Sequence, residues 1–163
     1  MDKFDLISDK IISGDKLAQK LAVLRFKERK IVFTNGCFDI LHRGHIEYIA
    51  KAASQGDEMI VGLNSDKSVR NIKGESRPVQ DEETRALILA SLEFVSYVVL
   101  FNEDTPYNII KQIQPDVLVK GDEYKAEDIV GYDIVSAKRG KIVTIKMIQG
   151  HSTTGILNRI LKD

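Results

Sequence analysis

The segment Thr34–His45, TNGCFDILHRGH, holds two of the chain's three histidines and its only cysteine. We call this segment the histidine loop. His42 and His45 are three residues apart, so on a helical turn both rings would face one side and could donate to one group of oxygens. Phosphoryl transfer uses such donors, because negative charge builds on the equatorial oxygens of phosphorus. The spacing therefore favours a phosphate site.

Two other interpretations of the histidine loop stay open on spacing alone. Cys37, His42 and His45 could hold zinc, but Asp39 would have to be the fourth ligand, because the chain has no second cysteine. The histidines could also be ordinary surface or capping residues. We expect Cys37 to pack within the loop, and we assign no protein side chain to a metal.

A second group of polar side chains precedes the apolar-periodic residues of the last helical segment. It reads GHSTTGIL and contains Ser152, Thr153 and Thr154, next to the third histidine. Hydroxyl groups at such a position are most often helix caps. They also form an anion cradle, because the start of a helix offers free N–H groups. Two such cradles would suit a polyphosphate that lies between them.

Basic residues follow the second apolar run in SVRNIKGESRP, which we interpret as a basic loop with Arg70, Lys73 and Arg77; Arg85 lies further on. Such residues usually form a solvated face. Their place beyond a strand makes Lys73 and Arg77 candidates for holding a second phosphate-bearing substrate. Lys120 stands at the end of another apolar run, in VLVKGDEY, where a lysine is rarely buried without a partner.

Short apolar, β-branched runs without polar alternation suit strands that are buried on both faces of a parallel sheet. The chain has five of them, at residues 30–35, 59–64, 96–101, 116–121 and 141–146. Segments with helical spacing lie between the runs. The pattern predicts an α/β fold, a Rossmann-like doubly wound parallel five-stranded sheet with helices on both faces. Ligands of such sheets bind beyond the carboxyl ends of the strands, where the winding reverses.

Length and charge narrow the class of protein. With 163 residues we expect one domain, 1–163, made of an N-terminal helical lead-in (1–29) and a catalytic core (30–163). Lys+Arg and Asp+Glu both total 24, which argues against a nucleic-acid or membrane-surface partner. The N-terminus is charged where a signal peptide would be apolar, and one cysteine makes no internal disulfide, so we expect a cytoplasmic protein.

The run GCFDILHRGH resembles the G-x-F-D-x-x-H-x-G-H signature of the cytidylyltransferase-like nucleotidyltransferases, which join a nucleoside monophosphate to a phosphorylated acceptor. The chain from about Lys30 onward is most similar to the branch of that family that transfers AMP from ATP to D-glycero-β-D-manno-heptose 1-phosphate. The similar pieces are IVFTNGCFDILHRGHIEYI, VGLNSDKSVRNIKGESRPV, EDTPYNIIKQIQPDVLVKGDEY, EDIVG and GHSTTGIL. This resemblance implies that ADP-heptose and pyrophosphate are formed, for lipopolysaccharide core biosynthesis.

The resemblance also implies ATP and a sugar 1-phosphate as substrates, and Mg²⁺ or a similar divalent ion that bridges the ATP phosphates. Related enzymes often form homodimers. The kinase domain often fused ahead of this domain is not recognisable in residues 1–29, so we expect a separate sugar kinase upstream in the pathway.

The residues and the resemblance together give a set of expected site residues. His42 and His45 would be catalytic. The expected nucleotide-binding residues are Thr34, Asn35, Gly36, Cys37, Phe38, Gly44, Lys120, Gly121, Asp122, Ser152, Thr153 and Thr154. The expected acceptor-binding residues are Asp39, Asn64, Lys73 and Arg77. The family more often reads Lys-Gly-Gly-Asp-Tyr where this chain has VKGDEY, so the equivalent acid is either Asp122 or Glu123.

Three rival functions remain. A glycerol-3-phosphate cytidylyltransferase shares the signature but uses CTP. A fragment of a class I aminoacyl-tRNA synthetase shares a related loop, yet the sequence has no Lys-Met-Ser-Lys-Ser-like motif. A non-catalytic nucleotide sensor would bind ATP without releasing pyrophosphate.

Overall fold

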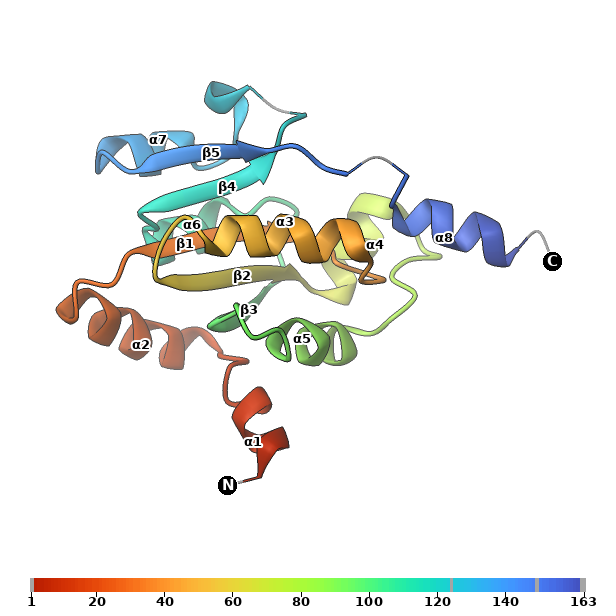
Figure 1. Ribbon diagram of the computed structural model, residues 1–163, viewed down its shortest axis with the longest axis horizontal. Helices are drawn as coiled ribbons and strands as arrows, with labels where there is room; N and C mark the ends of the chain where they lie inside the picture. The colour runs from red at the N-terminus through yellow and green to blue at the C-terminus, as the bar shows by residue number, and fades with distance from the viewer. Residues whose placement is uncertain (1, 124, 149, 162–163) are drawn as a thin grey trace.

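The computed structural model describes residues 2–123, 125–148 and 150–161 (Figure 1). Its sheet has five strands in the order β3-β2-β1-β4-β5, and every pairing is parallel. The strands are β1 (Ile31–Gly36), β2 (Glu58–Asn64), β3 (Tyr97–Phe101), β4 (Val117–Gly121) and β5 (Lys141–Ile145). The doubly wound sheet is thereby confirmed, and each strand end lies within one residue of its predicted position.

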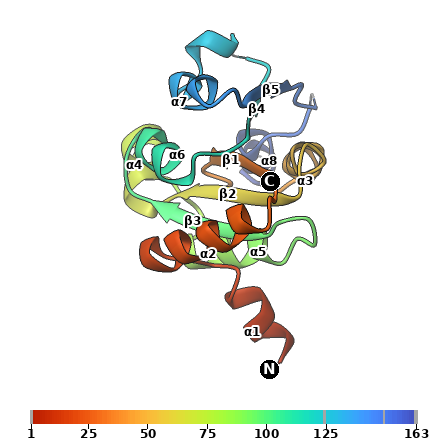
Figure 2. The same ribbon diagram turned by 90° about the vertical axis from the view of Figure 1, so that its left-hand side faces the viewer.

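Helices cover both faces of the sheet, as predicted. Helices α3 (Arg43–Ala53) and α5 (Glu82–Ala90) pack on one face, where Ile49 and Leu89 are fully buried. Helices α2 (Gly14–Phe26), α6 (Tyr107–Ile113) and α7 (Tyr132–Ala137) pack on the other, around Phe33 and Leu118. Figure 2 shows α3 and α6 on opposite sides of β1. Right-handed crossovers require this arrangement when the order of winding reverses between β1 and β4.

The residues before the first strand form two helices. Helix α1 (Lys3–Ser8) begins with a capping box between Asp2 and Asp5. Helix α2 then buries Leu17, Leu21 and Leu24 against the sheet, and their spacing of four and three residues places them on one face of the helix. We expected residues 1–29 to form one helix and its lead-in. The structure has two helices there, and the shorter one, α1, was not predicted.

The basic segment after β2 is only partly a loop, so the prediction is wrong for residues 68–73 and right for residues 74–78. Residues 66–73 form helix α4 (Asp66–Lys73), which Ser65 caps by accepting a hydrogen bond from the backbone N–H of Ser68. The helix has only two apolar residues, Val69 and Ile72, and so few apolar positions among charged residues did not stand out as a helix in the sequence. It ends at Gly74, whose φ of +95° falls in the left-handed region that favours glycine.

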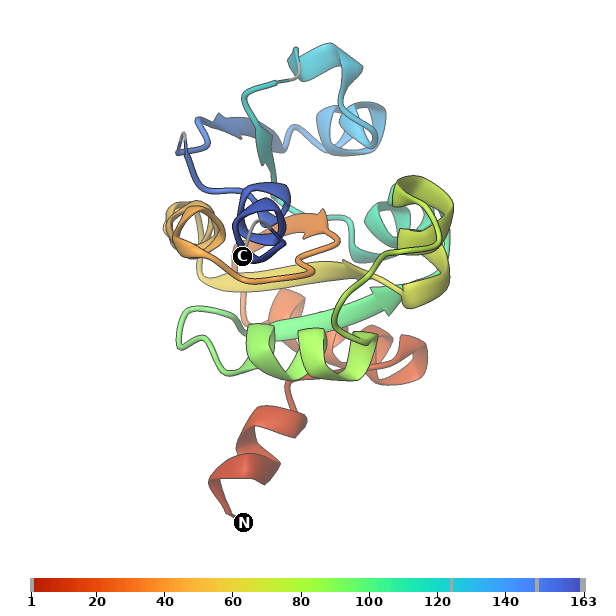
Figure 3. The same ribbon diagram turned by 90° about the vertical axis from the view of Figure 1, so that its right-hand side faces the viewer.

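The remaining elements are a 3₁₀ turn, η1 (Ala126–Asp128), and the last helix, α8 (Thr153–Ile160). Figure 1 shows α8 extending beyond the carboxyl edge of the sheet, and Figure 3 views that edge directly. Across the described parts of the chain, none of the helices is both long enough and apolar enough to cross a membrane.

Candidate active site

The sheet opens at the point where its winding reverses. The ladder between β1 and β2 runs as far as Gly36, whereas the ladder between β1 and β4 ends at Phe33 and Leu118. Beyond that pair lies a cavity of about 400 Å³, the β1–β4 cavity, lined by Asn35 and Gly36 of β1 and by Lys120 and Gly121 of β4. This is where a doubly wound sheet is expected to bind its ligand.

A larger cavity of about 590 Å³ adjoins the first one and reaches the start of α8. We call it the α8 cavity. His42, Asp122 and the residues Ser152–Thr154 line it. The two cavities share His45, Lys73 and Arg77, among other residues, so they are parts of one cleft.

Most of the expected site residues meet in this cleft. The β1–β4 cavity is also lined by Cys37, Phe38 and Asp39. Three expected residues, Thr34, Gly44 and Asn64, are buried next to the cleft and line neither cavity. Glu123 lines both cavities and Asp122 only the α8 cavity, so both candidate acids of VKGDEY reach the cleft.

The two signature histidines lie face to face. Their ring centroids are 3.8 Å apart with an angle of 22° between the planes, and Phe38 meets His45 edge-on at 5.3 Å. Burial, with a smaller contribution from His42, lowers the pKa of His45 to about 4. His45 is therefore neutral at pH 7. The Nδ1 atoms of both rings are buried without a hydrogen-bond partner in the part of the chain that the structure describes.

The third histidine joins this pair. The His151 ring lies 6.5 Å from the His42 ring at an angle of 25°, and both line the α8 cavity. Gly44 makes this approach possible, because a Cβ there would lie 3.1 Å from the His42 ring and 3.4 Å from the Cβ of His151. The glycine of the signature thus avoids a tight contact with the His42 ring. Its expected role in nucleotide binding stays a prediction.

Asp39 has a different environment from the one expected. Its carboxylate is 2% exposed and accepts hydrogen bonds from Arg77 Nε (2.6 Å) and from the backbone N–H groups of Val79 (2.8 Å) and Gln80 (3.0 Å). Burial alone would raise the pKa of Asp39, but these donors hold it below its usual value. The chain's own donors already occupy the carboxylate, so Asp39 positions Arg77, and its expected contact with the acceptor stays a prediction.

The hydrogen bond to Asp39 uses Nε of Arg77 and leaves Nη2 available to a ligand. Nη2 of Arg77 is buried and has no hydrogen-bond partner among the described residues, while Arg77 lines both cavities. Lys73, at the end of α4, also lines both. Together they can hold a phosphate, as the sequence predicted for this pair.

Arg85 was expected among the exposed basic residues, and this is wrong. It is fully buried, and its Nη1 donates to the carbonyl oxygens of Cys37 (2.6 Å) and Asn64 (2.9 Å). Nη2 donates to the Asp66 carboxylate at 2.7 Å. Arg85 therefore ties the histidine loop to the ends of β2 and α4. The available signal was its position inside the apolar stretch TRALILA, whose period buries Ala86 and Leu89.

Asn64 and Thr34 lie beneath the cleft. The Asn64 side chain donates to Ser68 Oγ at 2.9 Å, so it supports α4, although we expected it to contact the acceptor. Thr34 Oγ1 lies 2.7 Å from Tyr48 Oη and donates to the Val119 carbonyl oxygen at 3.0 Å. These bonds join β1, α3 and β4 under the floor of the cavity. Nucleotide binding by Thr34 stays a prediction.

Burial shifts the pKa values of both Cys37 and Lys120. Burial raises the pKa of the Cys37 thiol, which keeps it protonated and a poor nucleophile. Burial lowers the pKa of Lys120 to about 8, and its ammonium group donates to the side-chain oxygen of Asn35. Lys120 thus spans the opening between β4 and β1. A charged lysine at this place can stabilise negative charge on a bound phosphate.

The hydroxyl groups before α8 have the capping role that such residues usually have. Ser152 Oγ accepts a hydrogen bond from the backbone N–H of Gly155 at 3.0 Å. Thr153 Oγ1 donates to the Ile40 carbonyl oxygen at 3.5 Å, which connects α8 to the histidine loop. Both residues and Thr154 line the α8 cavity, so the start of α8 faces the histidines.

The zinc interpretation has no ligand set in this structure. Within residues 2–123, 125–148 and 150–161, no group of three or more His, Cys, Asp or Glu side chains could hold a metal ion. Asp39, which would have to be the fourth ligand, is bound to Arg77.

Known proteins with similar sequences include the bifunctional HldE proteins. The chain is 49% identical over 93% of its length to the bifunctional protein HldE of Wolinella succinogenes and 55% identical over 82% to that of Campylobacter concisus. It spans less than a third of those proteins, 31% and 27%.

Two solved structures share the fold. A lipopolysaccharide core biosynthesis protein from Thermoplasma volcanium is 28% identical with a TM-score of 0.64, over 74% of this chain and 99% of that chain. Pantoate-β-alanine ligase from Francisella tularensis, at 20% identity and a TM-score of 0.58, covers 94% of this chain and 78% of its own, and shows the fold alone. The cytidylyltransferase-like family model matches residues 33–159. The resemblance seen in the sequence is confirmed, and the chain belongs to the cytidylyltransferase-like family.

Proposed function

We propose that this chain transfers AMP from ATP to D-glycero-β-D-manno-heptose 1-phosphate, giving ADP-heptose and pyrophosphate for lipopolysaccharide core biosynthesis. The observation that carries the proposal is the joined cleft, in which His45, Lys73 and Arg77 line both cavities. The similarity to HldE proteins and to a lipopolysaccharide core biosynthesis protein supports the heptose acceptor and the pathway.

In this proposal ATP binds in the α8 cavity. Its triphosphate lies between the His42/His45 pair, at the start of α3, and the residues Ser152–Thr154, at the start of α8. The N–H groups at the start of α8 and the donors of the histidines face the phosphate oxygens. His45 is neutral at pH 7, so it donates one hydrogen bond and brings no charge.

The acceptor phosphate binds to Lys73 and Arg77 at the junction of the cavities. One of its oxygens attacks the α-phosphorus of ATP. A new bond forms between that oxygen and the α-phosphorus, and the bond to the bridging oxygen breaks, so that pyrophosphate leaves with the electron pair. A sugar phosphate is already an anion at neutral pH, so the reaction needs no general base. Catalysis then consists of positioning and electrostatic stabilisation.

A divalent ion such as Mg²⁺ fits this cleft. Mg²⁺ is usually held by one or two carboxylates together with substrate phosphates and water. Asp122 and Glu123 are the carboxylates that line the α8 cavity. They would hold an ion that neutralises charge on the phosphates of ATP.

The test is pyrophosphate release with Mg²⁺, in which ATP or CTP is offered with heptose 1-phosphate or with glycerol 3-phosphate. We expect release with ATP and heptose 1-phosphate alone. Release only with CTP and glycerol 3-phosphate would replace the proposal with a glycerol-3-phosphate cytidylyltransferase. ATP binding without release under any condition would indicate a nucleotide sensor.

A further inference from the structure

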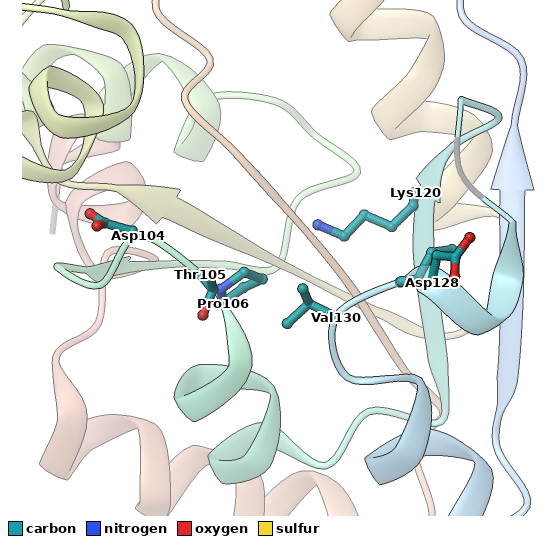
Figure 4. Close-up of a pocket in the computed structure, with 7 residues that line it drawn as sticks. Asp104, Thr105, Pro106, Lys120, Asp128 and Val130 are labelled. Carbon is teal, nitrogen blue, oxygen red and sulfur yellow. The ribbon is translucent and has the colours of Figure 1, made fainter.

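A third cavity, of about 200 Å³, lies where β4 meets α6 and η1. We call it the α6 cavity. Residues 104–106, which lead into α6, form one wall, and residues 128–130, at the end of η1 and just after it, form the other. Figure 4 shows Lys120 reaching from β4 into the space between these walls. Lys120 also lines the β1–β4 cavity, so the α6 cavity continues the cleft in which the reaction is proposed to occur.

The walls of the α6 cavity are held in place without a ligand. Gly131, with a φ of +91°, lies so close to α6 that a Cβ on it would be 2.8 Å from Ile110 Cδ1. Tyr107 Oη donates to the Asp133 carboxylate at 2.8 Å, which links the first turn of α6 to α7. Ile129 is 4% exposed and packs in the core beneath. The cavity is therefore preformed, as small-molecule sites usually are.

The lining combines apolar surface with carboxylates. Figure 4 shows Pro106 and Val130 near each other at the base of the cavity, with Asp104 and Asp128 at its two ends. Both residues are exposed, and in Figure 4 their carboxylates point away from Pro106 and Val130, so a ligand in the cavity would meet them after a change of side-chain rotamer. A phosphate would be repelled by two carboxylates, and a purely apolar ligand would form no hydrogen bonds with them. Asp104 Oδ1 also accepts a hydrogen bond from Asn71 Nδ2 at 3.2 Å. A sugar matches both features, because its hydroxyl groups donate to carboxylates and its C–H faces pack on apolar side chains.

Charge fixes the direction in which such a ligand would lie. The basic residues Lys73 and Arg77 line the adjoining β1–β4 cavity, whereas Asp104 and Asp128 line the α6 cavity, and Lys120 lines both. A sugar phosphate would place its anionic end among the basic residues and its hydroxyl groups among the acids. We propose that the α6 cavity binds the polyhydroxylated part of the phosphorylated acceptor, while Lys120, Lys73 and Arg77 face its phosphate. This inference rests on the proposed function.

The kinetic test removes each carboxylate in turn. In Asp128→Ala and Asp104→Ala, we expect the KM for heptose 1-phosphate to rise about tenfold, because a hydrogen bond to a charged group is lost. The KM for ATP and inhibition by inorganic phosphate should stay unchanged. The matched control is Glu127→Ala, which removes an exposed acid of the same 3₁₀ turn that does not line the cavity. An unchanged KM for the sugar phosphate, an equal effect in Glu127→Ala, or a rise in the KM for ATP instead would overturn the proposal.

A binding measurement separates this inference from the proposed function. The methyl signals of Ile129 and Val130 are followed by NMR in the wild-type chain, with heptose 1-phosphate or with inorganic phosphate added. We expect the sugar phosphate to shift them and inorganic phosphate to leave them in place. If they shift but wild type releases no pyrophosphate, the transfer reaction fails and the cavity assignment stands. If they do not shift, the cavity assignment fails, whether or not the chain is active.

Discussion

The two sides of the cleft are built in opposite ways. The histidine loop rests on buried polar groups, since Thr34 and Arg85 are fully buried, Asp39 is 2% exposed, and each makes hydrogen bonds to other elements. Helix α8 has no buried residue, and Ile160 near its end is 64% exposed. Its side-chain hydrogen bond to the loop, from Thr153 to the Ile40 carbonyl oxygen, is 3.5 Å long.

This difference indicates that the histidine loop and helix α8 contribute to the proposed reaction in different ways. Donors that stabilise a transition state act best when they are already fixed in place, because no reorganisation is needed during the reaction. The histidine loop meets that condition. In the proposed function, helix α8 adds donors that contribute mainly to holding the nucleotide. Substitutions in the histidine loop or in the buried residues that support it should therefore affect stability and turnover. Substitutions at the start of α8 should affect the KM for ATP.

The largest expected effect is on stability, in Arg85→Met. This substitution leaves the Cys37 and Asn64 carbonyl oxygens and the Asp66 carboxylate without their donor, so we expect a loss of about 3–5 kcal/mol in the free energy of unfolding. Urea unfolding measures it. Arg29→Met is the control, because its ion pair with Glu58 is partly exposed and should contribute at most about 1 kcal/mol. Equal losses in both variants would contradict the role given to Arg85.

His45→Ala should lower kcat by about 10²–10³-fold while the chain stays folded, because one fixed donor at the reacting phosphate is removed. Steady-state pyrophosphate release gives kcat, and circular dichroism checks the fold. The control is Arg43→Ala in the same turn of α3, where the ion pair with Glu47 is exposed. A folded His45→Ala with wild-type turnover would refute the catalytic role of His45.

The lowered pKa of His45 also predicts a pH dependence. As pH falls from about 6.5 toward about 4, the unfolded chain binds a proton at His45 that the folded chain does not, so stability falls. His42, whose pKa is also lowered by burial, adds to the same trend. Urea unfolding across this range should show a shallower loss in His45→Gln than in wild type. Equal slopes would contradict the burial of a neutral His45.

Removing the N-terminal cap from each of two helices tests the comparison with the smallest expected effects. Ser152 caps α8 and Asp81 caps α5, each by accepting a backbone hydrogen bond, and loss of a cap costs about 1 kcal/mol. In Asp81→Ala that loss should appear in global unfolding, because α5 is packed in the core. In Ser152→Ala the free energy of global unfolding should be unchanged, and the KM for ATP should rise roughly fivefold. The opposite pattern would refute the division between loop and helix.

Sequence reasoning predicted the sheet and the histidine cluster because both depend on local signals. β-branched runs such as KIVFTN encode buried strands, and the spacing of His42 and His45 is visible within one turn. The roles of Asp39 and Arg85 depend instead on partners distant in the chain, such as Gln80 for Asp39 and Cys37 for Arg85. An arginine in a sequence is usually exposed, and only the tertiary contacts show that this one is buried.

The most direct test of the central claim is to follow label from ATP. The chain is incubated with Mg²⁺, heptose 1-phosphate and ATP carrying ³²P at either the α or the γ position. Attack at the α-phosphorus predicts that the α label enters a nucleoside diphosphate sugar and that the γ label appears in pyrophosphate. Transfer of the γ label to the sugar phosphate, or no transfer of either label, would contradict nucleotidyl transfer in this cleft.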